Sequence, residues 1–308
     1  MKNSNAEKEA KRRKSGSKTS KFGVSSRSNH DASIFYEQKI NSDPHDYSVE
    51  PYFENSIDES YLNSIINKSS ESMSELPDAS IHLIITSPPY NVGKEYDQDL
   101  SLEEYLELLR KVFTESYRVL VKGGRIVINI ANIGRKPYIH LNGLLSKQLI
   151  EIGFIMRGEI IWSKGASSGG STAWGSWLSP SNPTLRDTHE YILVFSKSNY
   201  KRDNPEKRVT SITRDDFLEL TKSVWVIPTE SAKKIGHPAP FPIELPRKII
   251  DLYSFKDEVI LDPFIGSGST AIASIQSGRN FIGYEIDQKY VELANIRIAK
   301  YLKTLNES

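Results

Sequence analysis

The sequence predicts an α/β protein built on an open, mostly parallel sheet with helices on both faces. Strand-like segments alternate along the chain with amphipathic helical segments, and this alternation is typical of parallel sheets. One strand-like segment is almost entirely apolar, and a glycine-rich turn later joins another strand to a helix. The chain has 308 residues, of which 38% are hydrophobic and 26% charged, so it can bury a sizeable core.

The first predicted strand covers residues 81–85, whose sequence is Ile81-His82-Leu83-Ile84-Ile85. Such an apolar run fits a strand that is buried on both faces. Pro88 and Pro89 follow and end the hydrogen-bonded ladder, because proline has no N–H group to donate. The sequence therefore predicts a central strand that stops abruptly in a loop.

The other elements follow from the same periodicities. A helix is predicted over residues 102–120, where apolar side chains recur every three or four positions, and Ser101 with Glu104 has the spacing of a capping box. Gly123-Gly124 predicts a turn before a strand at 125–130. Further helices are predicted over 139–151, 243–254, 270–277 and 287–302, and further strands over 154–162, 190–195, 258–261 and 280–285.

Residues 1–45 are predicted to form a disordered basic tail. Residues 1–30 carry nine Lys and Arg but two Glu among Ser, Asn and Gly, too little apolar surface for a packed core. The tail either adds non-specific phosphate contacts or is a solvated extension. Residues 46–308 are predicted to form one domain, with insertions near 163–187 and 197–235.

The composition excludes several kinds of chemistry. The chain has no cysteine, which excludes disulfides, cysteine-bound zinc and any thiolate nucleophile. The six histidines show no paired helical spacing, so no metal site is expected. There is no apolar run of about 18 residues, and no apolar core follows the basic start. A cytoplasmic protein without a membrane partner is therefore expected.

A glycine-rich turn follows the predicted strand at 258–261, with the sequence Asp262-Pro263-Phe264-Ile265-Gly266-Ser267-Gly268. It lacks the lysine of a phosphate-binding P-loop and the third glycine of a dinucleotide site, which disfavours a nicotinamide dehydrogenase. Asp262 would repel phosphate but suits a ligand with an ammonium group and a sulfonium. Glu285, at the end of the next strand, is placed to bind ribose hydroxyls. S-adenosylmethionine fits these constraints, but a lone Gly-x-Gly is more often an ordinary tight turn, which is the alternative interpretation of this motif.

A second motif, Thr86-Ser87-Pro88-Pro89-Tyr90, comes directly after the first predicted strand. The two prolines fix the backbone, and their carbonyl groups remain free to accept hydrogen bonds. The Ser87 hydroxyl offers another acceptor, and Tyr90 offers a flat face for stacking. Acceptors beside a stacking surface suit the exocyclic amino group of a planar base. The alternative interpretation is a turn that merely ends the strand.

Together the two motifs resemble those of the amino-methyltransferases of bacterial restriction–modification systems. The resemblance covers roughly residues 75–302 and includes the stretches Arg118–Gly124, Glu190–Phe195 and His237–Pro242. The catalytic motif precedes the cofactor loop, which resembles the permuted beta class of that family. The resemblance implies a Rossmann-like methyltransferase domain, S-adenosylmethionine as cofactor and double-stranded DNA as substrate. It is also compatible with a cognate restriction endonuclease in the same system and with a homodimer.

The resemblance also implies roles for individual residues. The catalytic residues that hold the target base would be Ser87, Pro88, Pro89 and Tyr90. The cofactor-binding residues would be Asp262, Pro263, Phe264, Gly266, Gly268, Glu285 for the ribose, and Pro242 near the methionine tail.

The expected target base follows from two observations, the absence of cysteine and the serine at position 87. Methylation at cytosine C5 requires a cysteine nucleophile in related families, and this chain has no cysteine. Within the family, serine at the position of Ser87 favours cytosine N4, and aspartate favours adenine N6. Cytosine N4 in an extruded base is therefore expected, with adenine N6 or an RNA substrate as alternatives. A DNA-binding protein without catalysis is disfavoured, because neither Ser87 nor Tyr90 is altered.

Two segments have the composition of a DNA-contacting surface. Residues 197–214 hold six Lys and Arg against two acids, and the loop at 163–187 adds Trp174 and Trp177. The alternative interpretation is a solvated surface with two core tryptophans. The predicted DNA-binding residues are Lys164, Arg186, Lys201, Arg202, Lys207 and Arg208.

Overall fold

The computed structural model describes residues 38–41, 51–90, 100–134, 136–165, 175–230 and 241–307. The chain separates into two units, Met1–Glu50 and Pro51–Ser308. In the first unit the described residues form the short helix η1 (Lys39–Asn41). The predicted tail at 1–45 otherwise lies outside the described residues, so the fold below is that of the second unit.

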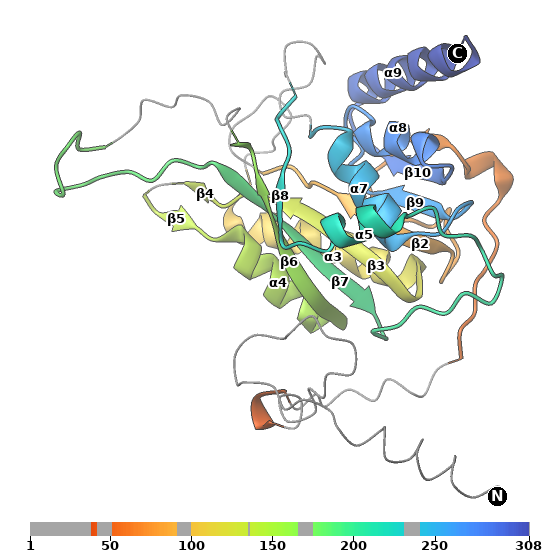
Figure 1. The fold of residues 1–308 in the computed structure, drawn as a ribbon, viewed down its shortest axis with the longest axis horizontal. Coiled ribbons are helices and arrows are strands. Elements are labelled where there is room, and N and C mark those ends of the chain that lie inside the picture. Colours follow the sequence, from red (N-terminus) through yellow and green to blue (C-terminus); the bar gives the residue numbers. More distant parts are fainter. Residues whose placement is uncertain are drawn as a thin grey trace, which may run out of the picture. The chain divides into compact units, whose positions relative to one another are not determined.

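An eight-stranded sheet forms the centre of the second unit, in the order β1-β10-β9-β2-β3-β7-β6-β8 (Figure 1). Strand β7 is antiparallel to both of its neighbours, and the other neighbouring strands are parallel. This arrangement confirms the predicted mostly parallel sheet. The strands are β1 (Ser64–Ile66), β2 (Ile81–Thr86), β3 (Leu120–Ile130), β6 (Phe154–Ser163), β7 (His189–Lys197), β8 (Val224–Val226), β9 (Val259–Asp262) and β10 (Asn280–Tyr284). A separate ribbon pairs β4 (Ile133–Gly134) with β5 (Tyr138–Ile139).

Helices cover both faces of the sheet, as expected. They are η2 (Glu59–Tyr61), α3 (Leu102–Val119), α4 (Leu141–Ile152), α5 (Arg214–Leu220), α7 (Glu244–Tyr253), α8 (Ser269–Gln276) and α9 (Gln288–Asn306). Phe113 of α3 and Leu145 of α4 pack in one apolar cluster with strand residues that include Ile128. Ile249 of α7 packs in a second cluster with Val127, the neighbour of Ile128 on β3. Because neighbouring strand residues point to opposite faces, the two clusters lie on opposite sides of the sheet.

The local signals in the sequence correspond to real contacts. The Ser101 hydroxyl accepts a hydrogen bond from the Glu104 amide, and the Glu104 carboxylate accepts one from the Ser101 amide. The predicted capping box at the start of α3 is therefore confirmed. Within the described ranges, no helix is both long and apolar enough to cross a membrane.

The predicted turn at Gly123-Gly124 is wrong, because both glycines lie inside β3. Strand β3 pairs with β2 at Leu120 and again from Arg125, and the register shifts between these points. Gly123 has a φ of +71°, and a Cβ at this position would lie 2.6 Å from the carbonyl oxygen of Lys201. The glycines thus let the strand bulge beside a neighbouring segment instead of ending.

Strand β2 occupies the position that matters for binding. All its side chains are buried, and it lies between β3 and β9. The chain passes from β2 to β3 in one direction and from β9 to β10 in the other. The sheet therefore has its topological switch point between β2 and β9. Ligands of open α/β sheets bind at such points, outside the carboxyl ends of the strands.

Candidate active site

The catalytic motif and the cofactor loop begin at the carboxyl ends of two neighbouring strands. Residues Leu83 and Ile84 of β2 pair with Ile260 and Leu261 of β9. At the ends of these strands, the Thr86 hydroxyl donates a hydrogen bond to Asp262 Oδ1 over 2.8 Å. Segments that are 176 residues apart in sequence therefore meet at the switch point.

Asp262 organises the cofactor loop from inside. Its side chain is completely buried, and its oxygens accept hydrogen bonds from the hydroxyls of Thr86 and Thr270 and the amide of Phe264. Burial raises the pKa of Asp262 to about 6, although the hydrogen bonds from Thr270 and Thr86 oppose that rise. These internal partners differ from the expected pairing with a ligand ammonium group. The carboxylate shapes the loop that would surround the ligand.

The glycines of the loop adopt conformations that other residues rarely take. Gly266 has a φ of +48° and Gly268 a φ of +81°. Gly268 is also the N-cap of α8, and a Cβ there would lie 3.1 Å from Cβ of Ala294 on α9. The loop therefore turns sharply and brings backbone N–H groups to the start of a helix, where a ligand can approach the main chain closely.

Glu285 lies beside this loop, directly after β10. Its Oε2 accepts a hydrogen bond from the Gly266 amide over 3.1 Å, and its Oε1 accepts one from the Asp287 amide over 2.9 Å. Each oxygen retains a lone pair that can accept a ribose hydroxyl. Burial raises the pKa of the Glu285 carboxyl, and hydrogen bonds from the Asp287 and Gly266 amides favour the charged form. This set of acceptors fits the ribose of S-adenosylmethionine.

Two of the other predicted cofactor residues are part of the loop, and the third precedes α7. Pro263 is buried, whereas Phe264 is partly buried against the cluster that contains Leu261 and Tyr284. Pro242 is buried just before α7, and its carbonyl accepts the amide of Leu245. Residues 237–240, the first part of the predicted His-Pro-Ala-Pro-Phe-Pro stretch, lie outside the described residues.

In the catalytic motif, Ser87 and Tyr90 are joined to two residues that the sequence did not single out. Ser87 Oγ lies 3.2 Å from the Tyr90 hydroxyl, which donates to Glu190 Oε2 over 2.9 Å. The side-chain amide of Asn129 also donates to Glu190 Oε2, over 2.6 Å. Asn129 and Glu190 are polar residues beside the apolar runs of β3 and β7, and that contrast is the signal that could have identified them.

Lys164 also belongs to this cluster. Its ammonium nitrogen lies 2.8 Å from Glu190 Oε1 and 5.7 Å from the centre of the Trp162 ring. The sequence predicted a DNA contact for Lys164. In the structure its ammonium group forms an ion pair with Glu190, the residue whose carboxylate accepts the Tyr90 hydroxyl. Burial and the charge of Glu190 raise the pKa of Tyr90 well above its ordinary value, so Tyr90 keeps its proton.

Comparisons with known proteins identify this arrangement. The sequence matches the DNA methylase family N6_N4_Mtase over residues 81–296. The chain belongs to this DNA methylase family. The match starts at β2 and ends within α9, so it spans both motifs and the strands that carry them. The predicted resemblance to DNA amino-methyltransferases is confirmed.

Two relatives and two solved structures show how far the likeness extends. The methylase is 32% identical to the type II methyltransferase M.MthZI of Methanothermobacter thermautotrophicus, across 78% of this chain and 77% of the relative. It is 28% identical to the DNA adenine methyltransferase YhdJ of Escherichia coli, across 73% and 79%. A putative DNA modification methylase of Thermus thermophilus, solved with S-adenosylmethionine, has 28% identity and a TM-score of 0.62, with 77% of this chain and 93% of that chain covered. The cytosine-N4-specific PvuII methyltransferase shares the fold, with a TM-score of 0.61 and 20% identity. The likeness covers 79% of this chain and 91% of that chain.

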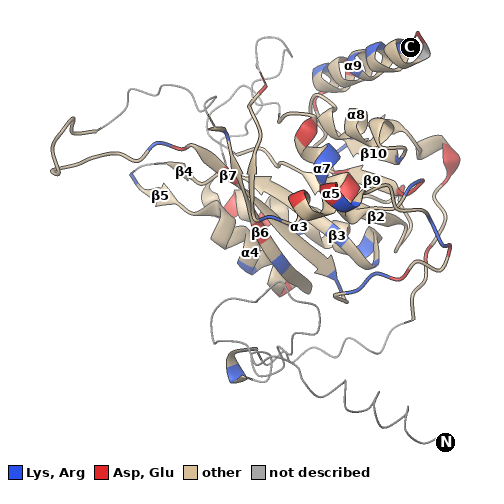
Figure 2. Cartoon of the chain, viewed as in Figure 1, with Lys and Arg blue, Asp and Glu red and all other residues tan. Residues whose placement is uncertain are grey.

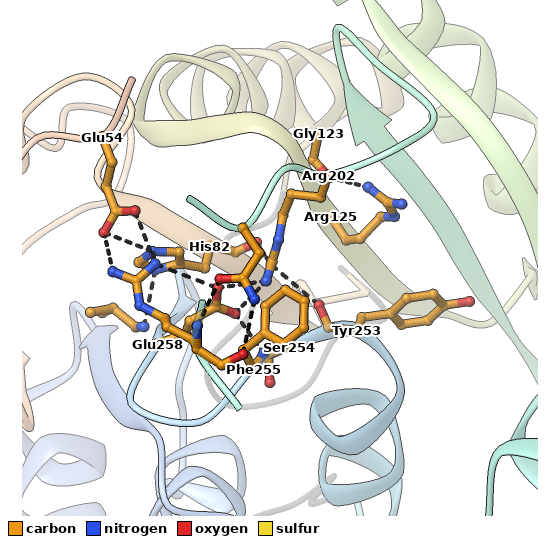
Figure 3. A network of polar contacts seen from close by, with 12 residues as sticks. Glu54, His82, Gly123, Arg125, Arg202, Tyr253, Ser254, Phe255 and Glu258 are labelled. Carbon is orange, nitrogen blue, oxygen red and sulfur yellow. Dashed lines mark hydrogen bonds and ion pairs between the residues drawn. The ribbon is translucent and has the colours of Figure 1, made fainter. Parts of the chain in front are cut away.

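Two predicted DNA-binding residues of the methylase are instead part of a buried ionic network (Figure 3). The Arg202 guanidinium contacts both oxygens of Glu258 at 2.5 and 2.7 Å, and both side chains are nearly inaccessible. Arg208 pairs with Glu54 at 2.7 Å. The DNA contacts expected for Arg202 and Arg208 stay predictions, and both guanidinium groups are already paired with carboxylates of the protein.

The remaining predicted DNA contacts lie at different edges of the sheet. Lys201 and Lys207 are exposed on the segment after β7, near the amino ends of β2 and β3, opposite the catalytic motif. In Figure 2, basic and acidic residues lie close together along this segment. Arg186 is exposed just before β7, at the carboxyl edge. Trp177 on the same loop is 64% exposed, which differs from a core role, whereas Trp174 lies outside the described residues.

Proposed function

We propose that this DNA methylase transfers a methyl group to the exocyclic N4 amino group of cytosine in double-stranded DNA. The observation that carries the proposal is the position of Ser87, whose hydroxyl contacts Tyr90 at the carboxyl end of β2 beside the cofactor loop. The methyl donor is S-adenosylmethionine, as expected from the loop. When bound, it supplies an electrophilic methyl group on its sulfonium.

The residues of the motif would hold the amino group of an extruded base. Extrusion costs roughly a few kcal/mol, and stacking on Tyr90 would return about 1–3 kcal/mol of it. Ser87 Oγ and the Pro88 carbonyl would accept one N–H each, which turns the nitrogen lone pair out of conjugation with the ring. Orientation of this kind contributes about 7–11 kcal/mol to a reaction between two bound groups. No covalent bond to the enzyme is needed.

The described loop at 175–188 is the best candidate for contact with the duplex around the extruded base. It leads into β7 at the carboxyl edge, the same edge as Ser87 and Glu190. Arg186 is exposed there, as are Trp177, Leu178 and Leu185. Basic and flat apolar side chains together suit phosphate contacts and base stacking. Lys201 and Lys207 would serve as peripheral phosphate contacts.

The system around the enzyme follows from the same proposal. Relatives of this chain are named type II methyltransferases, which supports a cognate restriction endonuclease as a partner in the same system. Methylation of the recognition site would then protect host DNA from that endonuclease. A homodimer is compatible with this role.

A second candidate is transfer to adenine N6 by the same mechanism. The observation in its favour is the 28% identity to a relative named as a DNA adenine methyltransferase. Both amino groups present two N–H donors to the acceptors of the motif, so the site could hold either base. Ser87 is the reason that we place cytosine first.

Expression in a host that lacks DNA methyltransferases tests both candidates. Genomic DNA from that host would be read by single-molecule sequencing, which detects modified bases from polymerase kinetics. We expect N4-methylcytosine in a short motif, and none in cells that express the Ser87→Ala variant. If the motif instead carries N6-methyladenine, the target base is adenine, and the proposed mechanism still applies. If wild type and variant both leave the DNA unmodified, the proposed DNA substrate is wrong.

A further inference from the structure

The carboxylate of Glu190 connects three strands and the catalytic motif. The side chain lies near the start of β7, and the residue is 9% exposed. Its Oε2 accepts hydrogen bonds from the hydroxyl of Tyr90 and the amide of Asn129, on β3. Its Oε1 contacts the ammonium of Lys164, which directly follows β6. Glu190 is therefore buried with a full set of partners, all of them at the proposed base-binding site.

The charge of Glu190 sets the direction of the hydrogen bonds next to it. An ionised carboxylate can accept hydrogen bonds but cannot donate them. The single hydroxyl proton of Tyr90 therefore points at Glu190, across 2.9 Å. The Tyr90 oxygen is then left as an acceptor, both for the side-chain amide of Asn129 over 3.1 Å and for Ser87, whose Oγ is 3.2 Å away. The chain of donors thus runs from Ser87 to Tyr90 to Glu190.

This direction has a consequence for the substrate. When the Ser87 proton is directed at Tyr90, Ser87 Oγ has two lone pairs for accepting; the Asn129 amide reaches one over 3.5 Å, and the other remains for an external donor. An exocyclic amino group is such a donor. If the chain ran the other way, the Ser87 proton would point outward and oppose the N–H groups of the base. The ion pair with Lys164, at 2.8 Å, agrees with this inferred direction, because it leaves Glu190 Oε2 as the acceptor that Tyr90 faces.

We propose that Glu190 is a positioning residue that fixes the hydrogen-bond chain Ser87–Tyr90–Glu190, so that Ser87 Oγ accepts a hydrogen bond from the amino group of the target base. The proposal rests on the proposed function, since it needs an amino group as substrate. Glu190 acts through Tyr90 and Ser87 and does not itself touch the base. A purely structural role, in which Glu190 only joins strands β3, β6 and β7, is the alternative that an experiment must separate.

The Glu190→Gln variant separates the two roles, because glutamine has nearly the shape of glutamate. If its carbonyl faces Lys164, its NH₂ group takes the place of Oε2, where it can donate to Tyr90 and reverse the chain but no longer accepts from Asn129. We expect the single-turnover rate of methyl transfer to fall about 10- to 100-fold. The dissociation constant for S-adenosylmethionine should stay close to wild type, and the rate is measured at a temperature where the variant is fully folded, because the lost contacts to Asn129 and Lys164 lower its stability. Glu159→Gln on the neighbouring strand β6 is the matched control, with no change expected.

A double-mutant cycle with Tyr90→Phe then tests whether Glu190 acts through the tyrosine hydroxyl. Phenylalanine keeps the stacking face but removes the hydroxyl that joins Ser87 to Glu190, and leaves the Asn129 amide as the remaining contact to both. We expect Glu190→Gln to cause no further loss of rate in the Tyr90→Phe background. Equal losses in both backgrounds, or no loss in the wild-type background, would overturn the proposal. A wild-type enzyme that binds S-adenosylmethionine but methylates no DNA would contradict the proposed function, and this inference with it.

Discussion

The Thr86 hydroxyl donates a hydrogen bond to Oδ1 of Asp262 over 2.8 Å, and both side chains are buried. Thr86 immediately precedes the residues proposed to hold the base, and Asp262 begins the cofactor loop. One bond therefore fixes the two halves of the site relative to each other, across the boundary between strands β2 and β9. A reaction between two bound groups depends on such a fixed distance.

Loss of the Thr86 hydroxyl should weaken cofactor binding. Thr86→Val keeps the shape of the side chain but leaves Asp262 Oδ1 with the Phe264 amide as its remaining partner. An underpartnered buried carboxylate costs about 1–3 kcal/mol, so we expect the free energy of unfolding to fall by that amount. The affinity for S-adenosylmethionine, measured by calorimetry, should fall with it. Thr86→Ser keeps the hydroxyl and serves as the control; equal behaviour of the two variants would contradict the role of the bond.

Stability should depend on the ionisation of Asp262. Burial raises the pKa of its carboxyl to about 6 in the folded protein, against about 4 in an unfolded chain. The folded state therefore binds this proton more tightly, and this contribution to stability is lost as pH rises from about 4 to about 6. Asp262→Asn removes the titration and can keep the acceptor and donor positions. We expect the variant to gain roughly 2–3 kcal/mol relative to wild type above pH 7 and little below pH 4, by urea unfolding. Parallel stability profiles would show that Asp262 does not titrate in this range.

The sequence predicted those parts of the fold that depend on local patterns. The buried run at 81–85, the capping box at Ser101 and the glycine-rich turn after Leu261 each carry their signal within a few residues. The short strands β1 and β8 and the helix α5 carry too little periodicity, and they were missed. Gly123-Gly124 was misread as a turn, because a bulge and a turn both favour glycine.

Contacts between residues far apart in the sequence could not be predicted from local composition. Tyr90 and Glu190 are 100 residues apart, and their contact depends on β7 inserting beside β3 in antiparallel orientation. Arg202 and Arg208 form part of a basic segment, and nothing near them in sequence indicates that Glu258 and Glu54 neutralise them. A charge count over a segment cannot distinguish a solvated cation from one that is paired with a distant carboxylate.

Glu285 should contribute directly to cofactor affinity. Glu285→Ala removes the acceptors proposed for the ribose hydroxyls and the partner of the Gly266 amide. We expect the dissociation constant for S-adenosylmethionine to rise about 10- to 100-fold, as for loss of one or two hydrogen bonds to a charged group. Asp287→Ser keeps a side-chain cap for α9 and serves as the control. An unchanged dissociation constant in the Glu285→Ala variant would mean that the ribose is held elsewhere.

Lys164 should affect the rate of transfer more than the affinity for DNA. Lys164→Met keeps an apolar stem near Trp162 but leaves the buried Glu190 carboxylate without its nearest cation. We expect single-turnover methyl transfer to fall about tenfold, because the charge that orients Tyr90 becomes less stable. The dissociation constant for DNA should change less than about twofold, with an unchanged salt slope. A lower salt slope would instead support the phosphate contact expected from the sequence.

Arg202 and Arg186 should respond to substitution in opposite ways. Arg202→Met leaves buried Glu258 without its main cation and with Arg208 at 3.8 Å and the Phe255 amide as partners, which costs about 3 kcal/mol. We therefore expect a large loss of stability and unchanged DNA affinity at a temperature where the variant is folded. Arg186→Ala, at the exposed carboxyl edge, should leave stability within about 0.5 kcal/mol, weaken DNA binding and lower the salt slope by about one. Chemical unfolding and salt-dependent binding to a fluorescent duplex measure both effects. Weaker DNA binding by folded Arg202→Met protein would show that the network in Figure 3 also supports the DNA surface.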